Sequence, residues 1–140
     1  MESAALLRQQ IIASLMAQQP GNIADAAMEH WEKLADEIIS IVGEAGFNSL
    51  YERSMHLAQS TFPWLPPCPS PPLTHQRFAE LRTHLADQTP AHARAAHSLL
   101  LTSFTDILAS LIGEQLTASI LRSAWGKLAS VPSGKEFDNE

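Results

Sequence analysis

Six histidines are the residues best suited to chemistry in this chain of 140 residues, yet their spacing does not predict a metal site. His92 and His97 are five residues apart, which places them on different faces of a helix, and His75 and His84 are nine residues apart. The chain has one cysteine and no His-Glu-x-x-His motif, and these are the patterns that bind zinc. We therefore predict no metal ion and no cofactor.

One histidine lies in a more specific context, the segment Ala96-His97-Ser98-Leu99-Leu100-Leu101-Thr102-Ser103. It resembles the phosphoacceptor helix of histidine phosphotransfer domains, which are all-helical and carry a pattern like Ala-His-Ser/Thr-Leu-Lys-Gly-Ser/Ala. The resemblance implies a signalling protein in which His97 accepts phosphate from a receiver partner. The Lys and Gly of that pattern are Leu100 and Leu101 here, and His97 lies on an apolar helical stripe. This position favours a core histidine with a hydrogen-bond partner, and phosphotransfer through His97 is the alternative prediction.

An internal repeat links two groups of charged residues. Residues 36–44 align with residues 106–114 at a constant offset, so each copy has an aspartate, two apolar pairs around a serine, and Gly-Glu. After a one-residue slip the match continues to Arg-Ser at residues 53–54 and 122–123. The repeat predicts two similar halves related by a pseudo-twofold axis.

The charges of this repeat predict ion pairs that hold apolar helices together. We expect Glu44, Arg53, Glu114 and Arg122 to be at least partly buried and paired, either within each half or across the axis. An unpaired charge inside an apolar bundle is costly, so matched charges beside glycines indicate partners. This role is structural rather than catalytic.

Cys68 lies in a stretch that no regular helix can cross, because residues 63–72 contain six of the nine prolines. An exposed thiol beside prolines can act as a haem ligand or a redox group, and the Pro-x-x-Pro spacings suit a proline-reading partner. The simpler interpretation is a stiff connector between the halves, which we place at residues 22–62 and 74–128. We expect one helical domain over residues 1–130 and a flexible tail over residues 131–140.

Composition and periodicity predict an all-α bundle of five or six helices. The chain has 20 Ala and 18 Leu but 2 Val, and hydrophobic residues make up 45% of it. Apolar residues recur with the helical period along residues 27–41 and 93–111. The run from Ala95 to Gly113 is long enough to span a membrane, but Asp106 near its centre favours a buried helix.

The remaining features favour a non-enzymatic interaction or regulatory module, because no catalytic or nucleotide-binding motif is present. The net charge of −6 disfavours nucleic-acid binding, and the cysteine usage and start of the chain indicate a cytoplasmic protein. Apolar helical surface beyond the needs of a small bundle predicts a homo-oligomer. Phe62, Trp64 and Trp125 form a candidate partner surface, unless they close the bundle ends.

Overall fold

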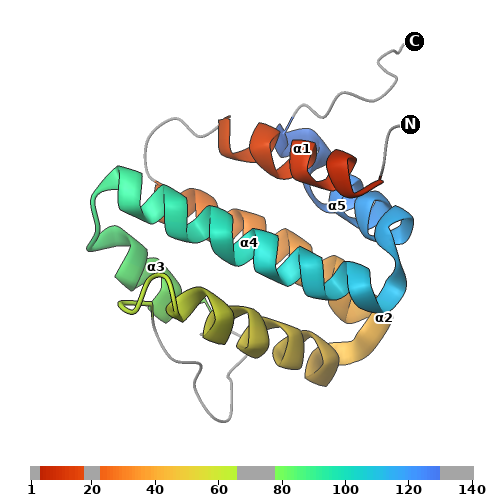
Figure 1. Cartoon of the computed structure of the whole chain (residues 1–140), viewed down its shortest axis with the longest axis horizontal. Coiled ribbons are helices and arrows are strands. Elements are labelled where there is room, and N and C mark those ends of the chain that lie inside the picture. Colours follow the sequence, from red (N-terminus) through yellow and green to blue (C-terminus); the bar gives the residue numbers. More distant parts are fainter. Residues whose placement is uncertain (1–3, 18–22, 66–77, 130–140) are drawn as a thin grey trace.

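A computed structural model of the chain describes residues 4–17, 23–65 and 78–129, and these form five helices and no strand (Figure 1). The all-α prediction is therefore confirmed. The helices are α1 (Ala4–Ala17), α2 (Ile23–Gln59), α3 (Ala79–Ala86), α4 (Pro90–Ile112) and α5 (Glu114–Ala129). Cys68, most of the proline-rich connector and the tail at residues 131–140 lie outside the described residues.

Two glycines bend the long helices. Gly43 divides α2 with φ 84° and ψ 168°, and Gly113 separates α4 from α5 with φ 97° and ψ 155°. Residues with a Cβ avoid this backbone region, so glycine is required at both positions. Each glycine lies at the end of a repeated segment and turns one long helix into a second one. The pseudo-twofold relation between the halves stays a prediction.

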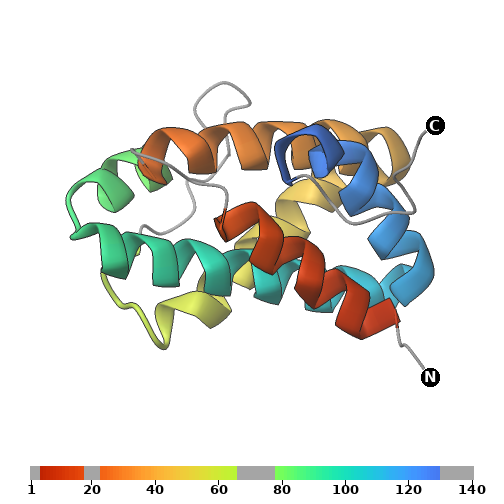
Figure 2. The same cartoon turned by 90° about the horizontal axis from the view of Figure 1, so that it is seen from above.

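Both bends lie at the same end of the bundle. In Figures 1 and 2 the first part of α2 and the whole of α4 run towards this end, where α1 also begins. We call it the bend end, made of the start of α1, the α2 segment around Gly43 and the α4–α5 junction at Gly113. Beyond the bends, the second part of α2 and α5 run back along the bundle.

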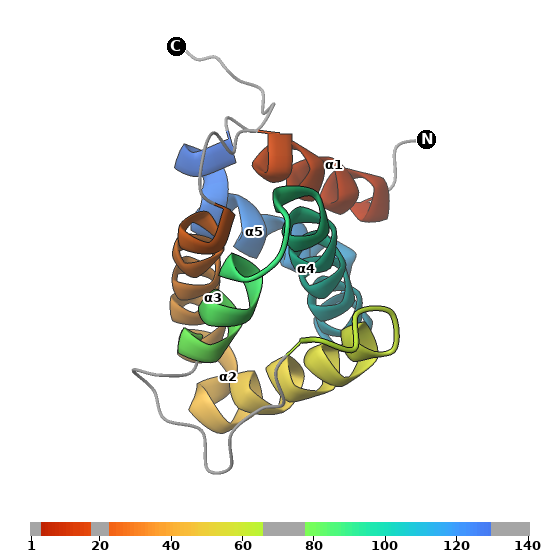
Figure 3. The same ribbon diagram turned by 90° about the vertical axis from the view of Figure 1, so that its left-hand side faces the viewer.

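The two short helices complete the bundle on different sides. α1 packs against α5 and α4, whereas α3 packs against α2 and α4 (Figure 3). α4 begins with a regular cap, because the Thr89 hydroxyl accepts a hydrogen bond from the backbone N–H of His92 and Pro90 occupies the first turn. The cap at Thr89 begins α4 at Pro90, and Gly113 ends it. Among the described helices, α4 is the longest without an internal break.

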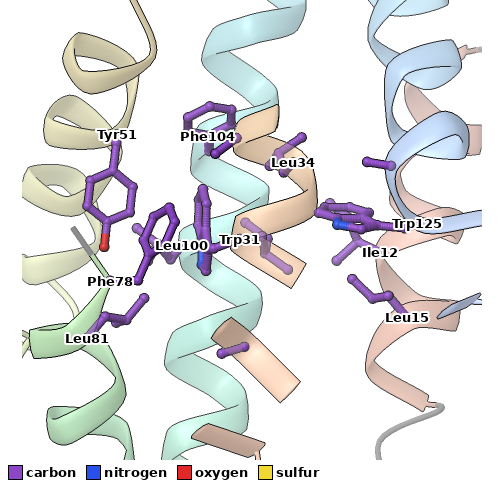
Figure 4. Close-up of a cluster of buried hydrophobic side chains, with 14 of the residues drawn as sticks. Ile12, Leu15, Trp31, Leu34, Tyr51, Phe78, Leu81, Leu100, Phe104 and Trp125 are labelled. Carbon is purple, nitrogen blue, oxygen red and sulfur yellow. The ribbon is translucent and has the colours of Figure 1, made fainter. Parts of the chain in front are cut away.

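The core contains two aromatic groups on either side of the α2–α4 contact. Trp31 is fully buried and makes edge-to-face contacts with Tyr51 and Phe104 at centroid distances of 5.2 Å. On the other side Trp125 packs beside Ile12 and Leu15 of α1 (Figure 4). Buried aromatic pairs of this geometry stabilise a fold beyond their area alone. The buried side chains of all five helices form one hydrophobic core.

Among the described helices, α4 is the one long and apolar enough to cross a membrane by length and composition. Of its most apolar window, 44% is buried inside the bundle. Its buried stripe includes His97 and Thr105, two polar residues that find hydrogen-bond partners on α2 and α1. A helix at the centre of a bundle meets the same length and composition criteria.

Candidate functional site

His97 lies in the core, against a second histidine that the sequence analysis did not single out. His97 on α4 and His30 on α2 are 0% and 1% exposed, and their rings stack at a centroid distance of 5.2 Å. The Nδ1 atom of His30 is 2.9 Å from the Nε2 atom of His97, so one ring donates a hydrogen bond to the other. Trp125 donates from Nε1 to the backbone carbonyl of His30 at 2.9 Å. The three side chains thus link α2, α4 and α5.

Burial keeps both imidazoles neutral. Desolvation lowers the pKa of His30 to about 4, and desolvation together with the electrostatic effect of the neighbouring His30 lowers the pKa of His97 to about 3. A phosphoacceptor imidazole has to meet a receiver domain at the surface, and His97 offers no exposed atom for that reaction. Its position is that of a core histidine with a hydrogen-bond partner, the interpretation that the apolar stripe favours.

The most elaborate polar site is built around Arg8, a residue that the sequence analysis missed. Arg8 projects from α1 and is 4% exposed. Its Nε and Nη2 donate to the two carboxylate oxygens of Glu114 at 2.9 and 3.1 Å, and Nη1 donates to the Thr105 hydroxyl at 3.1 Å. Nη1 also forms an ion pair with Asp106. The guanidinium therefore joins α1 to both helices that meet at Gly113.

The bidentate pair between Arg8 and Glu114 shifts the pKa values of both residues. The hydrogen bonds from Arg8 lower the pKa of Glu114, and the bonds to Glu114 raise the already high pKa of Arg8. The carboxylates are more open than the guanidinium, since the side chains of Asp106 and Glu114 are 57% and 38% exposed. The site is thus a buried cation held by two carboxylates at the edge of the bundle.

The predicted pairing of the repeated charges is wrong in its partners. Glu114 is partly buried and paired, but its partner is Arg8 rather than Arg53 or Arg122. Glu44, Arg53 and Arg122 are exposed rather than partly buried. The physical reason is the packing of α1, which supplies a buried arginine from outside the repeated segments. The single signal in the sequence was an arginine placed one turn before the apolar stripe of residues 11–15.

The aromatic surface predicted from Phe62, Trp64 and Trp125 is not a single surface. Trp125 is 0% exposed, because Ile12 and Leu15 of α1 cover it (Figure 4). Phe62 and Trp64 are half-buried just after α2 and contact each other edge to face at 5.8 Å. Trp125 therefore belongs to the core.

Exposed apolar side chains gather instead at the bend end. The six large hydrophobic residues that are exposed in the described part of the chain are Leu6, Ile41, Val42, Leu57, Leu111 and Leu116. All except Leu57 lie in the first turn of α1, directly before Gly43, or within three residues of Gly113. Ile41 and Leu111 occupy matched positions of the repeat and are 51% and 66% exposed.

Metal chemistry has no support in the geometry. Over the described ranges, no group of three or more His, Cys, Asp and Glu side chains is arranged to hold a metal ion. The two buried histidines contact each other, and Arg8 occupies the space between the two carboxylates.

Compared with known proteins, the chain matches no family model, no curated protein and no solved structure.

Proposed function

We propose that the chain is a non-enzymatic helical interaction module that associates with a second copy of itself through the bend end. The observation that carries this proposal is the gathering of five of the six exposed large hydrophobic residues in the three segments of that end. Exposed apolar side chains that gather in one region of a surface are characteristic of protein-binding sites.

Energetics support a contact surface at this position. Each exposed apolar side chain that becomes buried in an interface contributes roughly 25 cal/mol per Å². Ile41 lies two residues before Gly43 and Leu111 two residues before Gly113, so both belong to the bend end, and both are exposed. Their matched positions in the repeat also suit a twofold-symmetric contact, in which the same surface of each copy meets the other.

Sedimentation velocity over a range of concentrations tests this proposal. We expect the parent chain to gain mass with concentration, and the variants Ile41→Glu and Leu111→Glu to remain monomeric, because a buried unpaired carboxylate opposes association. Leu57→Glu is the matched control, since Leu57 is 45% exposed but lies near the far end of α2. A parent chain that stays monomeric at every concentration, or a Leu57→Glu variant that dissociates equally, would contradict the proposal.

A further inference from the structure

Arg8 bridges the bend between α4 and α5. Its guanidinium binds Asp106 on the α4 side of Gly113 and Glu114 on the α5 side. A Cβ built at Gly113 would meet no atom within 4 Å, so the bend has open space on that side of the backbone. The angle between the two helices is therefore fixed by contacts away from the glycine, and Arg8 supplies polar ones on both sides of it.

The same contacts hold together three of the segments that form the bend end. α1 brings Leu6, two residues before Arg8. The end of α4 brings Leu111, and the start of α5 brings Leu116. All three leucines are exposed, whereas Arg8 is buried, so a partner that covers the leucines touches little of the guanidinium. Arg8 thus positions these apolar side chains from beneath the surface that they form.

α1 depends on contacts with α4 and α5 for its own order. Ile11, Ile12 and Leu15 are buried, and Ile12 and Leu15 pack beside Trp125 (Figure 4). Within the described part of the chain, α1 packs against α5 and α4 but not against α2, the helix that follows it in sequence. A helix of 14 residues is marginal on its own in water, so α1 needs its docking site to stay helical. The bend-end surface is complete only when α1 is docked.

We propose that docking of α1 through Arg8 assembles the self-association surface of the bend end, so that α1 docking and self-association strengthen each other. A second copy binds the chain in which Leu6, Leu111 and Leu116 are held together, and it binds a chain with undocked α1 less tightly. By thermodynamic linkage, association then stabilises the docked state of α1 by the same factor. The inference rests on the proposed function, because it names what regulates the surface through which two copies associate.

Sedimentation velocity of Arg8→Gln tests the positioning role. We expect the dissociation constant for self-association to rise roughly tenfold or more, which lies in the usual range of coupling between two sites. Arg8→Lys keeps the positive charge and should restore part of the association. Arg82→Gln removes an arginine from an exposed ion pair between α3 and α2, and it should associate as the parent does. Circular dichroism of each variant measures whether the helices are retained.

Hydrogen exchange in the parent chain tests the reciprocal effect, and it does so even if Arg8→Gln does not fold. Exchange of the α1 amides is measured by mass spectrometry well below and well above the dissociation constant of the parent. At a concentration about ten times the dissociation constant, we expect these amides to exchange roughly tenfold more slowly, because a second copy binds the docked state. Ile41→Glu is the control, since a chain that stays monomeric should show no dependence on concentration.

Two results would overturn this inference and leave the proposed function intact. One is a folded Arg8→Gln variant that associates as tightly as the parent. The other is α1 exchange that does not depend on concentration in a parent chain that does associate. A parent chain that stays monomeric at every concentration would overturn the proposed function and this inference with it.

Discussion

At the scale of single residues, Arg8, His30 and His97 are the buried ionisable groups of the described core. Arg8 is satisfied by Thr105, Asp106 and Glu114. His30 and His97 are satisfied largely by each other, although Nδ1 of His97 has no hydrogen-bond partner in the described structure. An unsatisfied polar atom in a core reduces stability, so these residues should dominate the response of the protein to mutation and to pH.

Replacing Arg8 by alanine should lower the free energy of unfolding by about 1–3 kcal/mol, because a buried guanidinium with bidentate bonds is lost while its carboxylate partners are open to water. Arg82→Ala is the control, since both partners of the Arg82–Asp25 pair are more than half exposed and the expected loss is about 0–1 kcal/mol. Urea unfolding of the two variants measures both values. Equal losses would show that Arg8 is no more than a surface charge.

Acidification should destabilise the fold at pH values well above the usual pKa range of carboxylates. The folded-state pKa values of His30 and His97 are lowered from 6.5 to about 4 and about 3, so below pH 6.5 the unfolded chain takes up protons that the folded chain refuses. The free energy of unfolding should then fall by about 1.4 kcal/mol per pH unit for each histidine as the pH decreases from 6.5 towards 4.

Urea unfolding at several pH values between 7 and 5 measures how the free energy of unfolding depends on pH. The lowered pKa of Glu114 adds a loss of stability only at lower pH, below its ordinary value of 4.5. His97→Gln should reduce the slope, whereas His92→Gln removes an exposed imidazole and should leave it as in the parent. A pH-independent parent would mean that the histidines are hydrated in solution.

At the scale of elements, the backbone conformation of the bends requires glycine, whereas the space around them does not. A Cβ built at Gly43 or Gly113 would meet no atom within 4 Å, so space does not require glycine there. The positive φ angles do, because this region of conformational space is strained for every residue with a Cβ.

Gly113→Ala and Gly43→Ala should each lower the free energy of unfolding by about 1–3 kcal/mol through this strain. Gly126→Ala is the matched control, because Gly126 lies within α5 with open space around it and alanine is the better helix former, by about 0.5–1 kcal/mol. Thermal or urea unfolding of the three variants compares them directly. A destabilised Gly126→Ala together with unchanged bend variants would contradict the role of the bends.

At the scale of the whole molecule, α4 is held in the bundle by its contacts with the other described helices. α4 contacts α2, α5, α1 and α3, and its buried face holds Phe104 against Trp31. Leaving the bundle would separate His97 from His30 and Thr105 from Arg8, and the polar groups would enter hydrocarbon without partners.

The folded chain should therefore not bind phosphatidylcholine vesicles. Flotation of the chain with such vesicles through a density gradient measures this, and we expect the protein to remain at the bottom. Recovery of the chain in the floating fraction would contradict a core role for α4. The same experiment with a peptide of residues 90–112 is the control, because that peptide presents its apolar stripe without the bundle.

Much of the architecture was determined by local signals in the sequence. The helical class could be predicted from the apolar period and from the alanine and leucine content. The helix boundaries could be predicted from short local patterns, namely the Thr89-Pro90 cap and the glycines at positions 43 and 113. The prediction that His97 could be a core histidine also came from its place on an apolar stripe.

Only the tertiary structure decided which polar groups meet. Arg8 lies about a hundred positions before Glu114, and His30 lies on a different helix from His97, so no local pattern links either pair. No local pattern shows that Trp125 is buried, because α1 packs over it only in the folded chain. Nor does a local pattern show that Arg53 and Arg122 are exposed. Periodicity tells which face of a helix is apolar, but the partner of a buried charge is set by how the helices pack, and that packing is a property of the whole chain.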